Sequence, residues 1–268
     1  MELVATVRPA ADLDRAVLAL VESAGMTQAE ARMRLAPEPP ALLARVPAER
    51  AAELVAALGR AGAVALAIDE AVPSDADRFQ ARSFVFQDTG PTFTARGGAT
   101  LALGWAEVRL VLRGLRTAWT TTEHTETSRG FSMGRAVLTG GLVLTKETRS
   151  TVHASQEDSE QLLLVHGNGG ERILLAEKIL EFSGLGPLLQ PVRTANIGVL
   201  AQELKRRAPR AFHDDRLVRL GRRSLPFVLG GEQVLRSGSS EVRRSETRSS
   251  VDVLAEVLDR AVRAGLLG

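Results

Sequence analysis

One five-residue stretch, residues 130–134, has the G-x-S-x-G pattern that presents a nucleophilic serine in α/β-hydrolases. In those enzymes the serine occupies a strained turn between a strand buried on both faces and a helix. Here residues 120–129 before the motif are all polar, whereas a strand buried on both faces is apolar. The segment after the motif reaches Gly140 too soon for a stable helix. A serine hydrolase that uses Ser132 is therefore an alternative function and not the main expectation.

General bases and metal ligands are scarce. The sequence has four histidines: His124, His153, His166 and His213. Nothing in their spacing selects one as a base for Ser132, and their acidic neighbours lack the i, i+4 helical spacing that lets two ligands converge on a metal. The absence of cysteine excludes disulfides and thiolate chemistry. We therefore expect no metal, no cofactor and no catalysis.

Residues 203–223 form a basic segment that holds eight lysines and arginines against three acidic residues. Such a cluster can contact the phosphates of an anionic lipid or a nucleic acid. Nucleic-acid binding is usually assisted by interleaved aromatic side chains, and only Phe212 falls within the segment. The alternative is a basic face that is simply solvated. The residues predicted to bind are Arg206, Arg207, Arg210, Arg222 and Arg223.

An apolar stretch at residues 131–144 interrupts the polar sequence of residues 117–159. Gly140 and Gly141 could turn a hairpin inside it. Buried packing of this stretch is one interpretation. If it is exposed beside Arg129 and Lys146, its composition is typical of a surface that contacts lipid or a partner.

The elements that must position these residues begin with a short α+β pattern. Alternation and helical spacing predict a strand over 2–7, a helix over 12–23 and a second helix that starts at Thr27 and Glu30, which have capping-box spacing. Prolines end that helix, because proline lacks the backbone donor. A strand over 42–46, a helix over 48–61 and a strand over 63–68 follow. The predicted order in residues 1–69 is β-α-α-β-α-β.

This order resembles the C-terminal domain of the large-subunit ribosomal stalk protein, whose fold is shared with the Clp-protease adaptor family. The resemblance covers residues 2–69, about a quarter of the chain. The matching residues are Ala29, Ala31, Pro37, Ala51, Leu54, Leu58, Ala61, Gly62 and Ala63. The resemblance implies this small fold and, as a role, the docking of other proteins.

The rest of the chain predicts mostly strands. Residues 70–82 are polar and are expected to be a linker, and residues 83–268 a β-rich domain similar to a pleckstrin-homology domain or another small barrel. The polar stretch near 117–159 is expected as an insertion in that domain. A hairpin is predicted over 161–175, where Asn168-Gly169 suits a tight turn. Helices are expected around 197–207 and over 250–267. The last has an apolar face that we expect to pack on its own β-layer, with another copy or a partner as the alternatives.

Composition bounds the function. With 44% hydrophobic and 25% charged residues the chain can bury an ordinary core, and the helices and strands predicted above make it an α+β protein. Residues 1–80 hold 8 basic against 12 acidic residues, and the remainder 26 against 20, which suggests that two parts face different partners.

The start lacks the pattern of a signal peptide and no stretch suits a membrane span, so we expect a cytoplasmic location. The alanine, glycine and arginine bias suggests a bacterial, GC-rich genome.

The main functional hypothesis is a non-catalytic adaptor or scaffold. Its N-terminal domain would dock one protein, while the β-rich part would bind a second protein or an anionic surface. A phospholipid- or nucleic-acid-binding module and the Ser132 hydrolase are the alternatives.

Overall fold

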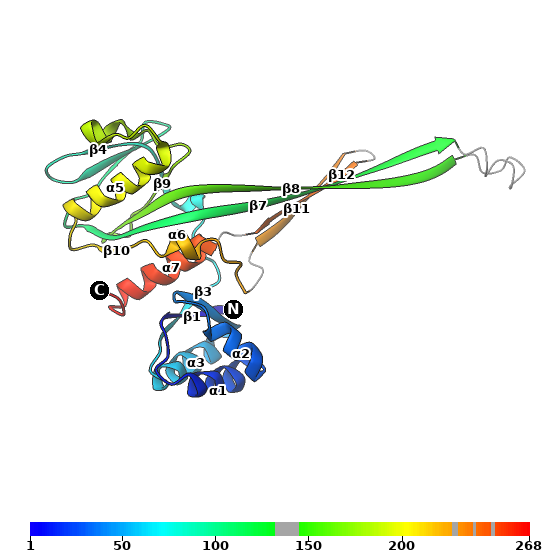
Figure 1. Cartoon of the computed structure of the whole chain (residues 1–268), viewed down its shortest axis with the longest axis horizontal. Helices are drawn as coiled ribbons and strands as arrows, with labels where there is room; N and C mark the ends of the chain where they lie inside the picture. The colour runs from blue at the N-terminus through cyan, green and yellow to red at the C-terminus, as the bar shows by residue number, and fades with distance from the viewer. Residues whose placement is uncertain (132–144, 227–229, 238–239, 248–249) are drawn as a thin grey trace, which may run out of the picture. The chain divides into compact units, whose positions relative to one another are not determined.

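The computed structural model describes residues 1–131, 145–226, 230–237, 240–247 and 250–268 (Figure 1). It contains helices and two separate sheets, a small antiparallel one and a larger mixed one, so the predicted α+β class is confirmed. In the described part of the chain, no helix is both long and apolar enough to cross a membrane.

The chain divides into two compact units. The first combines residues 1–116, 159–227 and 249–268, and the second combines residues 117–158 and 228–248. Both sheets are represented in the first unit, which also holds the helices.

The first 69 residues have the predicted element order. The elements are β1 (Glu2–Arg8), α1 (Leu13–Ala24), α2 (Gln28–Leu35), β2 (Ala41–Val46), α3 (Ala48–Arg60) and β3 (Val64–Asp69). The strands form an antiparallel sheet in the order β2-β1-β3. The Asp12 side chain caps α1 by accepting from the Arg15 amide at 3.0 Å, and the Thr27 hydroxyl caps α2 by accepting from the Glu30 amide at 3.2 Å. Gly25 ends α1 with a φ of 68°, in the left-handed region that favours glycine.

The small sheet is buried on both faces. Val4 and Leu43 pack into a cluster with Leu20, Leu54 and Leu58 of α1 and α3, and this cluster covers one face. The alternate residues Leu3, Ala5, Leu66 and Ile68 are also buried but lie outside that cluster. Because side chains alternate along a strand, these residues form the opposite face, which another element must cover.

The larger sheet contains nine strands: β4 (Phe79–Phe86), β5 (Pro91–Ala95), β6 (Thr100–Ala102), β7 (Val108–Phe131), β8 (Thr145–Gly167), β9 (Arg172–Ala176), β10 (Phe212–Asp214), β11 (Gly230–Ser237) and β12 (Ser240–Thr247). Its strand order is β11-β12-β7-β8-β9-β4-β5-β6, with β10 parallel to β7. Among the described strands no pair joins β6 to β11, so the sheet is open and the closed barrel that we expected is not seen.

One predicted boundary, that of the linker, differs from the structure. The linker expected over 70–82 contains a 3-10 turn, η1 (Asp75–Asp77), and β4 already begins at Phe79. The turn forms because Ser74 and Asp77 make a capping box, in which each side chain binds the backbone of the other. The polar stretch expected as an insertion over 117–159 nearly coincides with residues 117–158 of the second unit, and its described residues are strand, the continuation of β7 and β8.

The predicted hairpin over 161–175 is confirmed. The end of β8 pairs with β9 in antiparallel register, with Leu164 opposite Leu174. The Gly167 amide donates to the Glu171 carbonyl oxygen at 3.0 Å and closes the turn. Gly170 supplies the positive φ, 100°, whereas the sequence suggested that the Asn168-Gly169 pair would.

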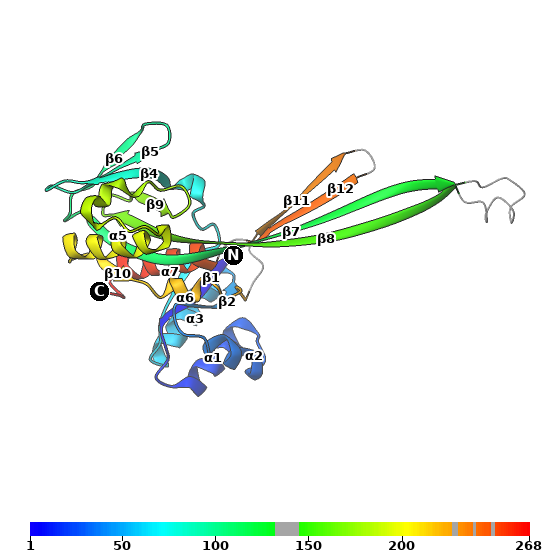
Figure 2. The same ribbon diagram turned by 45° about the horizontal axis from the view of Figure 1, so that its top comes forward.

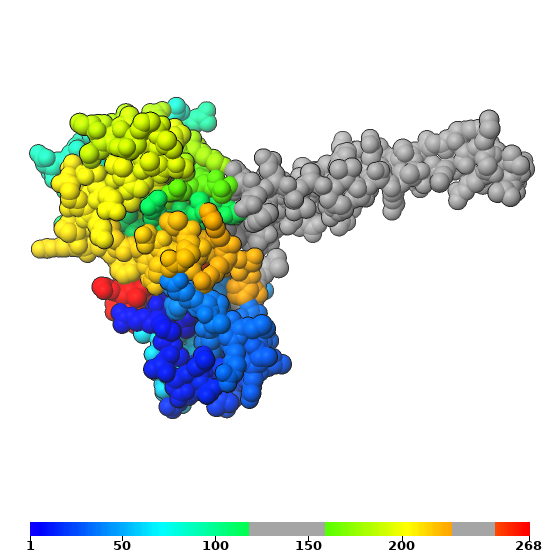
Figure 3. Space-filling model, in the orientation of Figure 1, coloured from blue at the N-terminus to red at the C-terminus, as the bar shows by residue number. Residues whose placement is uncertain are grey.

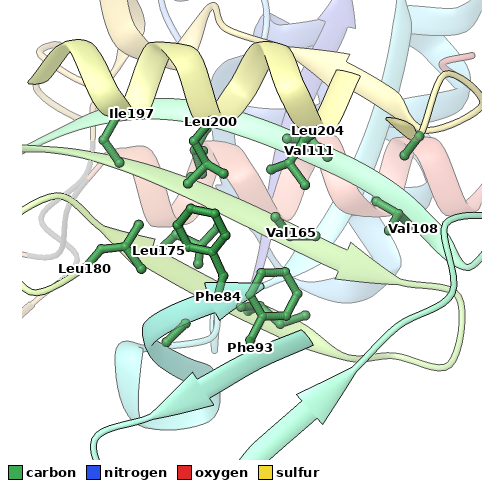
Figure 4. Close-up of a cluster of buried hydrophobic side chains, with 14 of the residues drawn as sticks. Phe84, Phe93, Val108, Val111, Val165, Leu175, Leu180, Ile197, Leu200 and Leu204 are labelled. Carbon is green, nitrogen blue, oxygen red and sulfur yellow. The ribbon is translucent and has the colours of Figure 1, made fainter. Parts of the chain in front are cut away.

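One face of the larger sheet carries the main core of the first unit. Helix α5 (Arg193–Arg207) lies on this face and directs Ile197, Leu200 and Leu204 into it (Figure 4). Phe84 and Phe93, both buried, meet these side chains from β4 and β5. The 3-10 segment η2 (Phe182–Leu188) closes the same cluster.

The C-terminal helix α7 (Ser250–Arg263) is buried on every side over residues 250–259. It contacts β1 and β3 of the small sheet, and its acidic residues pair with Arg109 and Arg172 of the larger sheet and with Arg78, which directly precedes β4. Figure 1 shows α7 between β1 and the strands of the larger sheet, and the turned view of Figure 2 shows α7 beside β1. The helix thus lies against its own β-layer, as expected, and also against the small sheet, which was not expected, so it fills the space between the two sheets.

The second unit consists of strands in its described residues. Strand β12 pairs with β7 from Ser240 opposite Glu126 to Glu246 opposite Thr120, and β11 pairs with β12 over their full lengths. All of these pairs are antiparallel.

Candidate functional site

An apolar groove of about 490 Å³ lies in the first unit, between α2 with the start of β2 and residues 223–226. Its floor is formed by Pro40 and Leu42 and by Leu254 of α7, all of which are buried. Leu225 and Pro226 line one wall. Figure 3 shows the surface of the α2–β2 region meeting the surface of the segment before residue 227. A volume of several hundred Å³ is typical of sites for small ligands, and it also suits a few side chains of a peptide.

The two walls of the groove are tied together by arginines from the segment around α6 (Leu217–Leu220). Arg219 donates to both oxygens of Glu38 at 2.7 and 2.8 Å, and Arg223 donates to the Glu38 carbonyl oxygen at 3.2 Å. Arg216 donates to the Pro39 carbonyl oxygen at 3.0 Å. The hydrogen bond from Arg219 lowers the pKa of the Glu38 carboxyl. These contacts position the loop between α2 and β2 against residues 223–226.

Met33 stands beside the groove and is its most exposed large apolar side chain, with 68% of its surface accessible. It belongs to α2, whose only buried residue is Ala31. A flexible, exposed methionine at the edge of an apolar depression is typical of surfaces that accept variable apolar partners.

The charged residues that line the groove are Glu30, Arg34 and Arg223. Arg34 is held by Glu30, with 3.3 Å between Nη2 and Oε1. Arg223 is exposed, and its bond to the Glu38 carbonyl oxygen uses one of the five guanidinium donors. The basic side of the groove is therefore the side of residues 223–226.

The predicted basic residues come from two places in the fold. Arg206 and Arg207 lie in the last turn of α5 and both pair with Glu203, at 2.8 and 3.3 Å. Arg207 also lies over the rings of Phe86 and Trp105, 5.1 and 5.7 Å from their centroids, so it serves packing.

Arg210 is exposed and follows α5, whereas Arg222 and Arg223 are exposed and follow α6. The neighbouring Arg216 and Arg219 are paired with Asp214 and Glu38. Much of the positive charge of the segment is thus balanced within the protein, and Arg223 alone of the five predicted residues lines the groove.

A layer of buried ion pairs, which was not predicted from the sequence, lies between α7 and the larger sheet. Asp252, Glu256 and Asp259 recur at helical spacing on one face of α7 and are almost fully buried. Asp252 accepts from Arg78 at 2.5 Å, and Glu256 accepts from Arg172 at 3.0 Å. The signal that could have found this layer is the i, i+4, i+7 spacing of acids in a helix that also has an apolar face.

Asp259 is the centre of that layer. Its carboxylate lies 2.6 Å from Arg109, 2.9 Å from His166 Nδ1 and 3.0 Å from Arg263. Burial of the Asp259 carboxyl raises its pKa, but the hydrogen bond and charge of His166 and the charges of Arg109 and Arg263 outweigh burial and lower the pKa to about 2. The carboxylate is therefore ionised throughout the physiological range.

The His166–Asp259 pair resembles half of a catalytic triad, but among the described residues no nucleophile is hydrogen-bonded to the histidine. His166 is 3% exposed, and its Nε2 atom is buried without a hydrogen-bond partner in the described part of the chain. A general base must reach the proton that it abstracts. We therefore assign this pair to the structural layer that anchors α7.

The other candidate catalytic and metal-binding residues of the sequence do not form a common site in the described part of the chain. His213 Nε2 lies 2.9 Å from the Ala208 carbonyl oxygen, beside a polar depression of about 140 Å³ that includes Asp214 and Asp215. Among the residues that the structure describes, no three His, Asp or Glu side chains gather as metal ligands. Ser132 and residues 132–144 lie outside the described residues. His124 and His153 fall within β7 and β8.

Comparisons with protein-family models, curated proteins and solved structures find no match to this chain. The resemblance of residues 2–69 to the ribosomal stalk domain stays a prediction. What the described site can do follows from its geometry: it can accept apolar side chains against a buried floor, beside an exposed guanidinium.

Proposed function

We propose that this protein is a non-catalytic adaptor that holds an apolar segment of a partner protein in the groove between α2 and residues 223–226. The observation that carries the proposal is the position of Met33, 68% exposed beside a floor of buried apolar residues. Covering one methionine side chain contributes on the order of 1.5–3 kcal/mol. That contribution is about ten- to a hundredfold in affinity.

Two further features support a protein partner. The arginines of the basic segment that pair with Glu203, Asp214 and Glu38 have part of their charge balanced inside the chain, which weakens the case for phosphate binding. The groove walls are fixed by Arg216 and Arg219, so little ordering is needed on binding. A contact of Arg206 and Arg210 with an anionic surface and a cytoplasmic location belong to the same proposal as secondary parts.

Met33→Glu tests the proposal. Because Met33 is exposed, the substitution should leave the fold intact while it places a desolvated charge in the interface. We expect at least about tenfold weaker co-purification of the partner from the native cell extract. Leu18→Glu is the matched control, since Leu18 is 49% exposed on α1 and does not line the groove. Equal capture by the wild type and both variants would contradict the proposal.

A further inference from the structure

We infer that the segment bound in the groove carries a carboxylate beside its apolar side chains, and that Arg223 receives this carboxylate. The inference rests on the proposed function and extends it by naming the chemistry of the partner. The partner segment contains large aliphatic side chains, such as leucine, together with acidic side chains. The groove supplies the apolar half of the recognition, through Met33, Leu42 and Leu225.

The charged residues around the groove would recognise the carboxylate of the partner segment. Arg222 and Arg223 are consecutive and exposed, and among the described residues no carboxylate lies within ion-pair distance of either. The acids nearest to the groove are already occupied, since Glu30 pairs with Arg34 and Glu38 with Arg219. The charge of Arg223 also acts on the Glu38 carboxylate, but that carboxylate makes its ion pair with Arg219. A basic edge whose arginines make no ion pair of their own favours an anionic partner and disfavours a cationic one.

Arg223 is held in place for this role. Its Nη1 donates to the Glu38 carbonyl oxygen at 3.2 Å, which fixes the guanidinium at the wall and leaves donors for a second acceptor. A guanidinium can offer two parallel N–H groups to one carboxylate, which adds direction to the charge attraction. An exposed pair of this kind contributes modestly, so selectivity for a carboxylate over an amide of about threefold to fivefold is expected.

The chain offers a clean reporter for this inference. It contains four methionines, so 13C-methyl methionine spectra of the full chain give few signals, and loss of one signal in Met33→Leu assigns Met33. The probes are the capped hexapeptide Leu-Glu-Leu-Leu-Glu-Leu and its counterparts with glutamine or lysine in place of both glutamates. Decanoate serves as a fourth probe, because a free fatty acid shares the same carboxylate and apolar chemistry.

The expected order of affinity at the Met33 signal is glutamate, then glutamine, then lysine peptide. Arg223→Gln should remove the advantage of the glutamate peptide over the glutamine peptide, whereas Arg222→Gln should keep it, since Arg222 does not line the groove. Equal binding of the glutamate and glutamine peptides to the wild type would overturn the carboxylate inference and leave the apolar groove in place. No shift with any probe at millimolar concentration would contradict the proposed function itself. Tighter binding of decanoate than of the glutamate peptide would overturn the assignment to a protein segment.

Discussion

A chain that ends at residue 249, without α7, is expected to lose cooperative folding in both sheets of the first unit. Residues 250–259 are buried on every side, and α7 contacts β1 and β3 as well as the basic residues of the larger sheet. Val251, Leu254 and Leu258 are each less than 5% exposed. Losing three such side chains alone removes on the order of 5–9 kcal/mol, which is comparable with the net stability of a domain.

Thermal unfolding followed by circular dichroism would measure this effect. We expect no cooperative transition, and amide exchange should show loss of protection in β1 and β3 together with β7 and β9. A chain that ends at Arg263 is the control, because it removes residues 264–268 after the end of α7 and should melt within a few degrees of the wild type. Retained protection in β1 and β3 of the longer truncation would contradict the position of α7 between the sheets.

Asp259→Ala is expected to lower the free energy of unfolding by about 3–5 kcal/mol, because it leaves Arg109 and His166 without their buried acceptor. Urea unfolding of the variant and the wild type gives this difference directly. Asp14→Ala is the matched control: Asp14 also pairs with an arginine, at 2.6 Å from Arg32, but its side chain is 79% exposed. It should cost less than about 1 kcal/mol. Equal effects of the two substitutions would show that the buried layer does not anchor α7.

The same carboxyl should make stability depend on pH. Its pKa is lowered from 3.8 to about 2 in the folded chain, so the ionised carboxylate stabilises the fold above the unfolded pKa and this contribution is lost as the pH falls from about 4 towards 2. A shift of this size corresponds to about 2 kcal/mol. Asp259→Ala should therefore show a shallower loss of stability over that range than the wild type.

The elements of residues 1–69 could be predicted from the sequence because their signals are local. Asp12 and Thr27 cap α1 and α2, and Gly25 ends α1, so each boundary depends on residues within one turn. The hairpin of β8 and β9 was predictable for the same reason, since glycines mark its turn between two apolar runs.

The contacts of α7 could not be predicted in this way. Asp252 suits a helix start in sequence, yet its carboxylate binds Arg78 and Arg116, at 2.5 and 3.2 Å. Arg78 is 174 residues away, and no local pattern identifies such a pair. The groove could not be predicted for the same reason: Leu42 and Leu254 both line it, and they come together only when α7 lies on the small sheet.

The extent of β7 and β8 was underestimated because polar residues suggested an insertion. Residues 117–131 include many threonines, which favour strands through their branched side chains. Pairing with β12, from Thr120 to Glu126, provides hydrogen-bond partners for the backbone of β7 in this part of the strand. The prediction followed the polar composition of these residues and therefore did not extend the strands through them.

The measurement that tests the adaptor most directly is photo-crosslinking from position 33 in living cells. A photoreactive phenylalanine analogue in place of Met33 should give one discrete protein adduct, and mass spectrometry should map the linked site to an apolar segment that contains a carboxylate side chain. The same analogue in place of Leu18, which is exposed on α1 outside the groove, should not give that adduct. No adduct at position 33, or the same adducts at both positions, would contradict a partner-binding groove between α2 and residues 223–226.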